Sequence, residues 1–80
     1  MNAVVYSKDG CPSCAMAKNL LESKGIKYQD FNMTLHPEKR EELFEVAATI
    51  NIVPRSVPQI WINSKYIGGF DALQLFFSDN

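Results

Sequence analysis

Two cysteines, Cys11 and Cys14, are the residues of this 80-residue chain whose type and spacing could do chemistry. They are all the cysteines the chain has, and a bond between residues so close in sequence would restrict the unfolded chain little. Secreted miniproteins use more cysteines at wider spacing. The pair therefore suits thiol–disulfide exchange, in which one thiol attacks a disulfide and a second thiol releases the mixed disulfide.

The same spacing also suits half of a zinc site. Zinc would need two further ligands, and His36 is the one histidine in the sequence. We therefore expect no bound metal.

The elements around the cysteines indicate which thiol attacks. Residues 3–6 form a short apolar run typical of a buried strand, and residues 7–10 predict a turn. A helix is predicted from Cys11, with Pro12 in its first turn. The partial positive charge of a helix N-terminus favours a thiolate, so Cys11 is expected to be exposed and acidic. Cys14, one turn further along, is expected to be the more buried, resolving thiol.

The remaining elements follow from apolar spacing and chain breakers. The first helix should end at Gly25, and residues 26–33 predict a second strand. A second helix should open at His36-Pro37 and present four apolar residues to the core: Leu43, Phe44, Ala47 and Ile50.

The C-terminal third predicts a hairpin and a short helix. Residues 59–62 and 66–68 should pair as strands around a turn at 63–65. Trp61 on the first of these strands is expected to pack in the core or on the surface and not to contact a ligand. Asp71 stands where the N-cap of the last helix is expected.

The predicted order is β-α-β-α-β-β-α in a single α/β domain spanning residues 1–80. Strands joined through a helix are expected to be parallel with right-handed crossovers, and the closing hairpin antiparallel. This order predicts a four-stranded mixed sheet flanked by helices.

Charge and hydropathy indicate which classes of partner are not expected. The net charge of −1 gives no reason to expect nucleic acid or an anionic membrane. No apolar run approaches the ~20 residues of a membrane span. The N-terminus lacks the pattern of a secretory signal, so we expect a cytoplasmic location. We also expect a monomer.

Four sequence blocks, in order, resemble the signatures of glutaredoxins, which have a thioredoxin-like fold: Tyr6-Ser7-Lys8, Cys11-Pro12-Ser13-Cys14, Ser56-Val57-Pro58-Gln59-Ile60 and Ile67-Gly68-Gly69-Phe70-Asp71. The last block is most similar to small phage glutaredoxins. The resemblance implies a dithiol–disulfide oxidoreductase with glutathione as co-substrate and no bound cofactor. It also implies disulfide-containing proteins as substrates, with ribonucleotide reductase a common recipient of electrons.

The resemblance also implies the glutathione-binding residues. Pro58 is expected to follow a cis peptide bond against the disulfide, which would let the Val57 backbone pair with glutathione as an added strand does. A trans proline at the start of an edge strand is the alternative. Gly69, Phe70 and Asp71 are expected at the γ-glutamyl end, where helix N–H groups suit a carboxylate.

The resemblance implies that Asp71 pairs with the ammonium group of glutathione. The alternative is that Asp71 serves only as a helix cap. Lys8 is similar to the family lysine near the glycyl carboxylate, and Arg40 and Arg55 are further candidates for that carboxylate.

The sequence departs from the family pattern at three places. Ser13 stands where many glutaredoxins have tyrosine, and it is expected to contribute a hydroxyl to the glutathione site. Ala72 stands where the family often has a second aspartate next to the one that matches Asp71. Residues 48–55 form a longer segment than in the shortest bacterial relatives and should border the glutathione groove.

Two other functions remain open from the sequence. One is a thioredoxin-like electron donor recharged by a flavoprotein reductase, against which Gly10 stands where thioredoxins have tryptophan. The other is a dimer that carries an iron–sulfur cluster through Cys11 and two glutathiones. Pro12 opposes it, because it stiffens the loop that would have to open.

Overall fold

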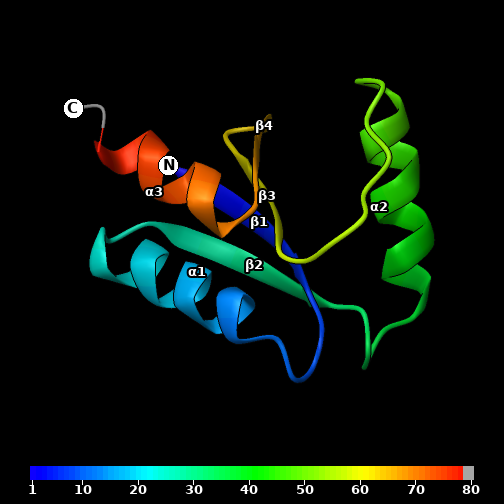
Figure 1. The fold of residues 1–80 in the computed structure, drawn as a ribbon, viewed down its shortest axis with the longest axis horizontal. Coiled ribbons are helices and arrows are strands. Elements are labelled where there is room, and N and C mark those ends of the chain that lie inside the picture. Colours follow the sequence, from blue (N-terminus) through cyan, green and yellow to red (C-terminus); the bar gives the residue numbers. More distant parts are fainter. Residues whose placement is uncertain (79–80) are drawn as a thin grey trace.

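A computed structural model describes residues 1–78 and contains seven helices and strands (Figure 1). In chain order they are β1 (Asn2–Ser7), α1 (Pro12–Ser23), β2 (Lys27–Asn32), α2 (Glu38–Ala48), β3 (Gln59–Ile62), β4 (Lys65–Gly68) and α3 (Phe70–Ser78). This is the predicted element order, and the third strand begins and ends at the predicted residues.

The four strands form one mixed sheet in the order β2-β1-β3-β4. β1 runs parallel to β2 and antiparallel to β3, and β3 and β4 form an antiparallel hairpin. Asn63 and Ser64 both have positive φ angles, of 51° and 66°. Two consecutive residues of that conformation match the twist of a tight hairpin, so the turn joins β3 directly to β4.

The expectation that every strand pair joined through a helix is parallel was wrong for β2 and β3. β3 is antiparallel to β1, and therefore also to β2. The C-terminal end of α2 lies near Asn2 and Asn63 at the far end of the sheet. Segment 49–58 then returns to the other end of the sheet, so β3 starts at the end of the sheet where β2 ended. A connection through a helix gives parallel strands only when the chain returns to the end of the sheet where the first strand began.

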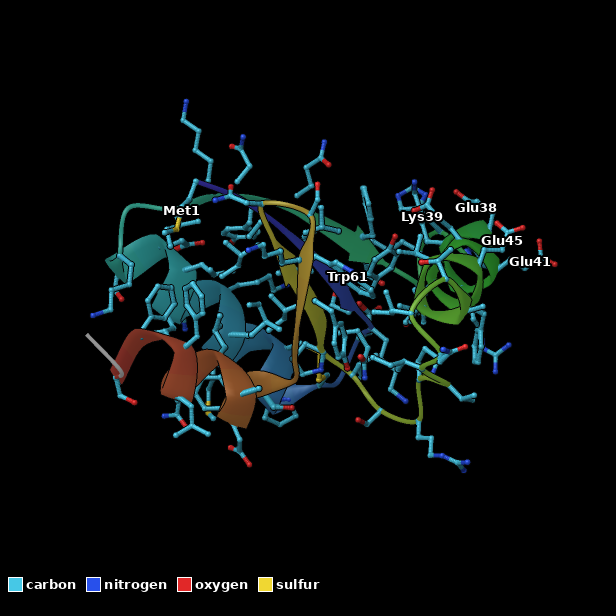
Figure 2. All side chains as sticks on the ribbon, turned by 90° about the horizontal axis from the view of Figure 1, so that it is seen from above. Met1, Glu38, Lys39, Glu41, Glu45 and Trp61 are labelled. Carbon is cyan, nitrogen blue, oxygen red and sulfur yellow. A yellow bond between two sulfur atoms is a disulfide. The ribbon has the colours of Figure 1, made fainter. Side chains whose placement is uncertain are left out.

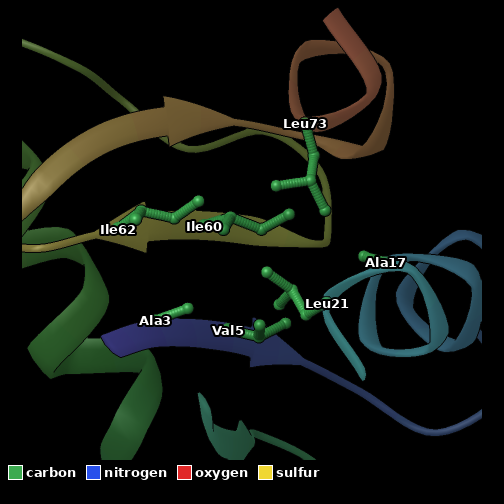
Figure 3. Close-up of a cluster of buried hydrophobic side chains, with 7 residues drawn as sticks. All are labelled: Ala3, Val5, Ala17, Leu21, Ile60, Ile62 and Leu73. Carbon is green, nitrogen blue, oxygen red and sulfur yellow. The ribbon is translucent and has the colours of Figure 1, made fainter. Parts of the chain in front are cut away.

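The main core lies between the sheet and the two helices α1 and α3 (Figure 3). Its buried members come from alternate positions of β1 and β3 and from one face of each helix: Ala3, Val5, Ala17, Leu21, Ile60, Ile62 and Leu73. Alternation sends one strand face inward because successive side chains point to opposite sides of a sheet. This core holds α1, and with it both cysteines, against β1.

A second, aromatic cluster lies on the opposite face of the sheet, under α2. Tyr6, Trp61 and Leu43 are its buried members. The Tyr6 hydroxyl donates to Glu42 of α2 over 2.9 Å, and Lys39 pairs with the same carboxylate. Burial raises the pKa of Tyr6 above its ordinary range, and the hydrogen bond to Glu42 adds to the shift. Glu42 thus ties α2 to the centre of the sheet.

Three other charged residues of α2, Glu38, Glu41 and Glu45, face away from the sheet (Figure 2). The apolar face predicted for α2 is correct for Leu43 and Ala47, which are buried. It was wrong for Ile50, which lies beyond the end of the helix and is 44% exposed. The helix ends before the apolar spacing does, because the chain turns at Asn51, where φ is 60°.

The start of α3 also differs from the prediction that Asp71 is its N-cap. The Leu73 N–H donates to the Gly69 carbonyl over 3.0 Å, and the helix begins at Phe70. Gly69 therefore takes the N-cap position, where the carbonyl accepts the first helical bond. Asp71 lies inside the first turn, close to the positive end of the helix dipole. None of the described helices is long and apolar enough to cross a membrane.

Candidate active site

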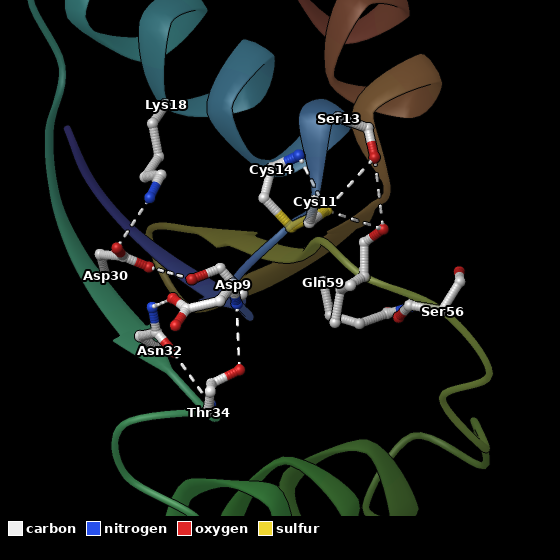
Figure 4. The surroundings of a disulfide bond; sticks show 12 residues. Asp9, Cys11, Ser13, Cys14, Lys18, Asp30, Asn32, Thr34, Ser56 and Gln59 are labelled. Carbon is white, nitrogen blue, oxygen red and sulfur yellow. Dashed lines mark hydrogen bonds and ion pairs between the residues drawn. A yellow bond between two sulfur atoms is a disulfide. The ribbon is translucent and has the colours of Figure 1, made fainter.

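Cys11 and Cys14 form a disulfide at the N-terminus of α1 (Figure 4). Cys11 is the N-cap residue and is half-buried, whereas Cys14 is only 2% exposed. The Cys14 N–H donates to the Cys11 sulfur over 3.1 Å. Cys14 is the more buried of the two cysteines, as predicted, whereas Cys11 was expected to be exposed and is half-buried. The difference between them follows from the helix starting between the two residues.

The loop between β1 and α1 is fixed by contacts with the end of β2. Asn32 donates to the Asp9 carboxylate over 2.9 Å, and the Asp9 N–H donates to the Thr34 hydroxyl over 3.0 Å. Gly10 completes the turn with a φ of 70°, a conformation that glycine adopts at little cost. These contacts fix the position of the loop that leads to Cys11.

A polar chain beside the disulfide joins β1, β2 and α1. The buried Ser7 hydroxyl donates to the Asp30 carboxylate, and Lys18 pairs with the other oxygen of that carboxylate over 2.8 Å (Figure 4). Lys18 lies one helical turn after Cys14. The contact therefore holds the first turns of α1 against the ends of the two parallel strands.

The Val57–Pro58 peptide bond is cis, and Val57 reaches the disulfide. The Val57 carbonyl oxygen lies 3.8 Å from the Cys11 sulfur and accepts from the Ser13 hydroxyl at 3.5 Å. The same hydroxyl is 3.5 Å from the Cys11 sulfur. The backbone of Val57 thus lies beside the more accessible sulfur, with Ser13 contacting both.

The segment that carries Val57 is supported by Gln59 and Tyr66. The Gln59 side-chain amide donates to the Ser56 carbonyl over 2.9 Å, and the Tyr66 hydroxyl donates to the Gln59 side-chain oxygen over 2.6 Å. Burial also raises the pKa of Tyr66. The sequence analysis did not single out Gln59 or Tyr66, because their contact joins two strands and leaves no local pattern.

An open groove beside the disulfide, which we call the cis-proline groove, contains six of the seven predicted binding residues: Ser13, Val57, Pro58, Gly69, Phe70 and Asp71. Its volume of about 580 Å³ lies within the range of small-molecule sites. Met16 and Ser56 line it as well and were missed by the sequence analysis. Met16 follows Ser13 by three residues on α1, and Ser56 directly precedes Val57, and this proximity is the signal that could have found them.

Lys8, the seventh predicted residue, lines a second groove of about 460 Å³, which we call the cationic groove. Arg40 of α2 and Arg55 of segment 49–58 line it too. Ser56 and Val57 belong to both grooves, so the two meet beside Cys11. The predicted residues therefore flank the disulfide on two sides.

The arrangement supports thiol chemistry. After reduction, the Cys14 N–H and the α1 dipole would favour a thiolate on Cys11, and Cys14 would be close enough to displace a bound partner. Among residues 1–78, no group of three or more His, Cys, Asp or Glu side chains could hold a metal ion.

Comparisons with known proteins agree with this geometry. A family model described as Glutaredoxin matches residues 3–67. Glutaredoxin 3 of Escherichia coli is 39% identical over 72 residues, which cover 90% of this chain and 81% of that protein.

Two solved structures share the fold. Glutaredoxin 1 from Francisella tularensis, complexed with cacodylate, has a TM-score of 0.80 at 25% identity and covers 98% of this chain and 93% of its own. A buckwheat glutaredoxin–glutathione complex has a TM-score of 0.79 at 28% identity, covering 96% and 68%. With the paired cysteines at the helix N-terminus, these matches show that the chain belongs to the glutaredoxin family of thiol–disulfide oxidoreductases.

Proposed function

We propose that this protein is a glutathione-dependent dithiol–disulfide oxidoreductase. The observation that carries the proposal is the meeting of the two grooves at Val57, beside the Cys11 sulfur. One groove ends at the N-terminus of α3 and at Asp71, and the other contains Lys8. A ligand with charged groups at both ends and a cysteine between them fits that arrangement, and glutathione has this chemistry.

Each predicted residue then has a role in holding glutathione. The Val57 backbone pairs with the cysteinyl part, as an added strand would. The N–H groups of Phe70 and Asp71, in the first turn of α3, face the γ-glutamyl carboxylate, and the Asp71 carboxylate pairs with its ammonium. Lys8 attracts the glycyl carboxylate at the other end. Ser13, Pro58 and Gly69 shape the wall between them.

The reaction runs in two exchanges. The Cys11 thiolate attacks a substrate disulfide, forming a mixed disulfide and releasing one substrate thiolate. Cys14 then attacks Cys11, closing the protein disulfide and releasing the second thiolate, so the substrate gains two electrons. Two glutathione molecules restore the protein dithiol and leave as glutathione disulfide.

The proposal extends to the setting of the reaction. We place the protein in the cytoplasm as a monomer, with ribonucleotide reductase as one candidate recipient of electrons. The resemblance to glutaredoxins supports ribonucleotide reductase as a recipient.

A coupled assay tests the glutathione dependence. The oxidised protein is supplied with glutathione, glutathione reductase and NADPH, or with thioredoxin reductase and NADPH, and substrate disulfide reduction is followed. We expect sustained turnover only with glutathione. Turnover with thioredoxin reductase alone would contradict the proposal and favour a thioredoxin-like electron donor. A Cys11→Ser variant controls for direct reduction of the substrate by glutathione.

A further inference from the structure

Positive charge is concentrated in the cationic groove, although the whole chain has a net charge of −1. Lys8, Arg40 and Arg55 line the groove, and no aspartate or glutamate is among its described lining residues. The ion pairs found in residues 1–78 involve Lys18, His36 and Lys39, so none of the three groove cations is neutralised by a carboxylate. The groove therefore attracts anions.

Three cations exceed what glutathione supplies on that side. In the proposed orientation, only the glycyl carboxylate enters the cationic groove, and it carries one negative charge. Glycine also has no side chain to cover the apolar part of the groove, where the half-buried Phe44 and Pro54 lie. The Arg40 guanidinium lies 4.8 Å from the Phe44 ring centroid, so charge and apolar surface are adjacent. Positive charge and apolar surface in the groove therefore remain available to a ligand larger than glutathione.

The direction of the chain in the groove follows from the same orientation. The γ-glutamyl end lies at α3 and the glycyl end toward Lys8, so residues that follow the reacting cysteine run into the cationic groove. A polypeptide that pairs with the Val57 backbone in the same direction would place its next residues there. An internal peptide lacks the terminal carboxylate of glutathione, and acidic side chains would supply the missing charge.

We propose that the cationic groove selects protein disulfides whose reactive cysteine is followed by acidic residues. Arg40 and Arg55 are the specificity-determining residues. The proposal rests on the proposed function for the direction of the bound chain. The reaction is the exchange described above, in which the protein dithiol is oxidised to the Cys11–Cys14 disulfide and the peptide disulfide becomes a dithiol.

The test uses protein reduced in advance with dithiothreitol and freed of it, and no glutathione. Peptides with one internal disulfide carry Glu-Glu, Gln-Gln or Lys-Lys directly after the second cysteine. Single-turnover reduction is quenched in acid and analysed by chromatography. Each rate is divided by the rate of the same peptide with dithiothreitol, because neighbouring charges alter the reactivity of the peptide thiols themselves.

We expect the Glu-Glu peptide to react about threefold to tenfold faster than the Gln-Gln peptide at low salt, and the Lys-Lys peptide to react slowest. The preference should largely disappear in about 0.5 M salt, because these charges are exposed. Arg40→Gln and Arg55→Gln should each reduce the ratio of Glu-Glu to Gln-Gln rates. Lys65→Gln, which removes an exposed charge at the end of the sheet away from Lys8, should leave that ratio unchanged.

Equal normalised rates for the three peptides would overturn the proposal. So would a preference that survives in both arginine variants, or one that Lys65→Gln reduces as much, because net charge would then be the cause. Melting curves of the variants show that each is folded. Because no glutathione is present, these outcomes are independent of whether glutathione recharges the protein.

Discussion

The backbone N–H of Cys14 donates a hydrogen bond to the sulfur of Cys11 over 3.1 Å, across the first turn of α1. In the reduced protein this donor and the helix N-terminus would face the Cys11 sulfur. Both stabilise a negative charge more than a neutral thiol. The accessible cysteine is therefore the one whose ionised form the fold favours.

We predict that the pKa of the reduced Cys11 thiol lies below the ~8.5 of a free cysteine. Ultraviolet absorbance of the thiolate against pH measures it, with Cys14→Ser as the variant that isolates Cys11. Cys11→Ser is the control and should lose the low-pH transition. A single transition near the free value in Cys14→Ser would show that the helix terminus does not activate the nucleophile.

The burial difference between the two sulfurs predicts a division of labour. Cys11→Ser should abolish exchange with every substrate, because Cys14 is only 2% exposed. Cys14→Ser should still reduce glutathione mixed disulfides, since a second glutathione can release Cys11, but it should lose most activity on protein disulfides. The measurement compares the two substrate types, and alkylation of the reduced wild type adds a direct check. Labelling of Cys14 before Cys11 would reverse the assignment.

The Tyr6–Glu42 hydrogen bond predicts a loss of stability in alkali. The pKa of Tyr6 is raised by burial and by Glu42, and the hydrogen bond to Glu22 raises the pKa of Tyr28 to about 12 from an ordinary value of 10.0. The unfolded chain therefore releases tyrosine protons that the folded protein keeps. Stability from these groups is complete below about pH 10 and decreases as the pH rises toward the folded values.

Tyr6→Phe tests this contribution. It removes one hydrogen bond, so we expect a loss of about 1 kcal/mol near neutral pH and a decrease in melting temperature of about 4–8 °C. The variant should then lose less stability than the wild type between about pH 9 and 11. Urea unfolding at several pH values measures both effects. Parallel pH curves for the two proteins would mean that Tyr6 is not the group responsible.

The parts of the fold that the sequence predicts are those marked by residues close together in the chain. Gly10, Gly25 and the turn at Asn63 and Ser64 adopt positive φ angles, and residues of these types mark such turns in a sequence. Apolar runs bounded by turn residues marked the strands, and spacing located the cysteines at a helix start. These features depend on residues close together in the chain.

Features that depend on distant residues were not predictable in this way. Segment 49–58 contains no pattern that shows it returning along α2, so the direction of β3 was misjudged. The Tyr6–Glu42 and Tyr66–Gln59 contacts join separate elements without a local signature. The N-cap of α3 shifted to Gly69 because a glycine can take that position without a side-chain acceptor. Resemblance to a family brought the groove residues together where spacing could not.

The position of Asp71 in the first turn of α3 sharpens the test of its role in binding glutathione. Asp71→Asn removes the charge and keeps the shape. Because Asp71 is not the cap, the expected loss of stability is only the interaction with the helix dipole, about 0.3–1 kcal/mol. A partly exposed ion pair with the glutathione ammonium is worth up to about 1 kcal/mol, or roughly fivefold in apparent affinity.

Turnover is measured against glutathione concentration, with melting curves beside it. Asp71→Asn should raise the glutathione concentration needed for half-maximal turnover, and the difference from wild type should shrink at high salt. Adding Ala72→Asp to Asp71→Asn returns a carboxylate to the next position in the same groove, and should recover part of the lost affinity. If Asp71→Asn uses glutathione as well as wild type at every salt concentration, Asp71 only stabilises the helix, and the ammonium has another partner or none.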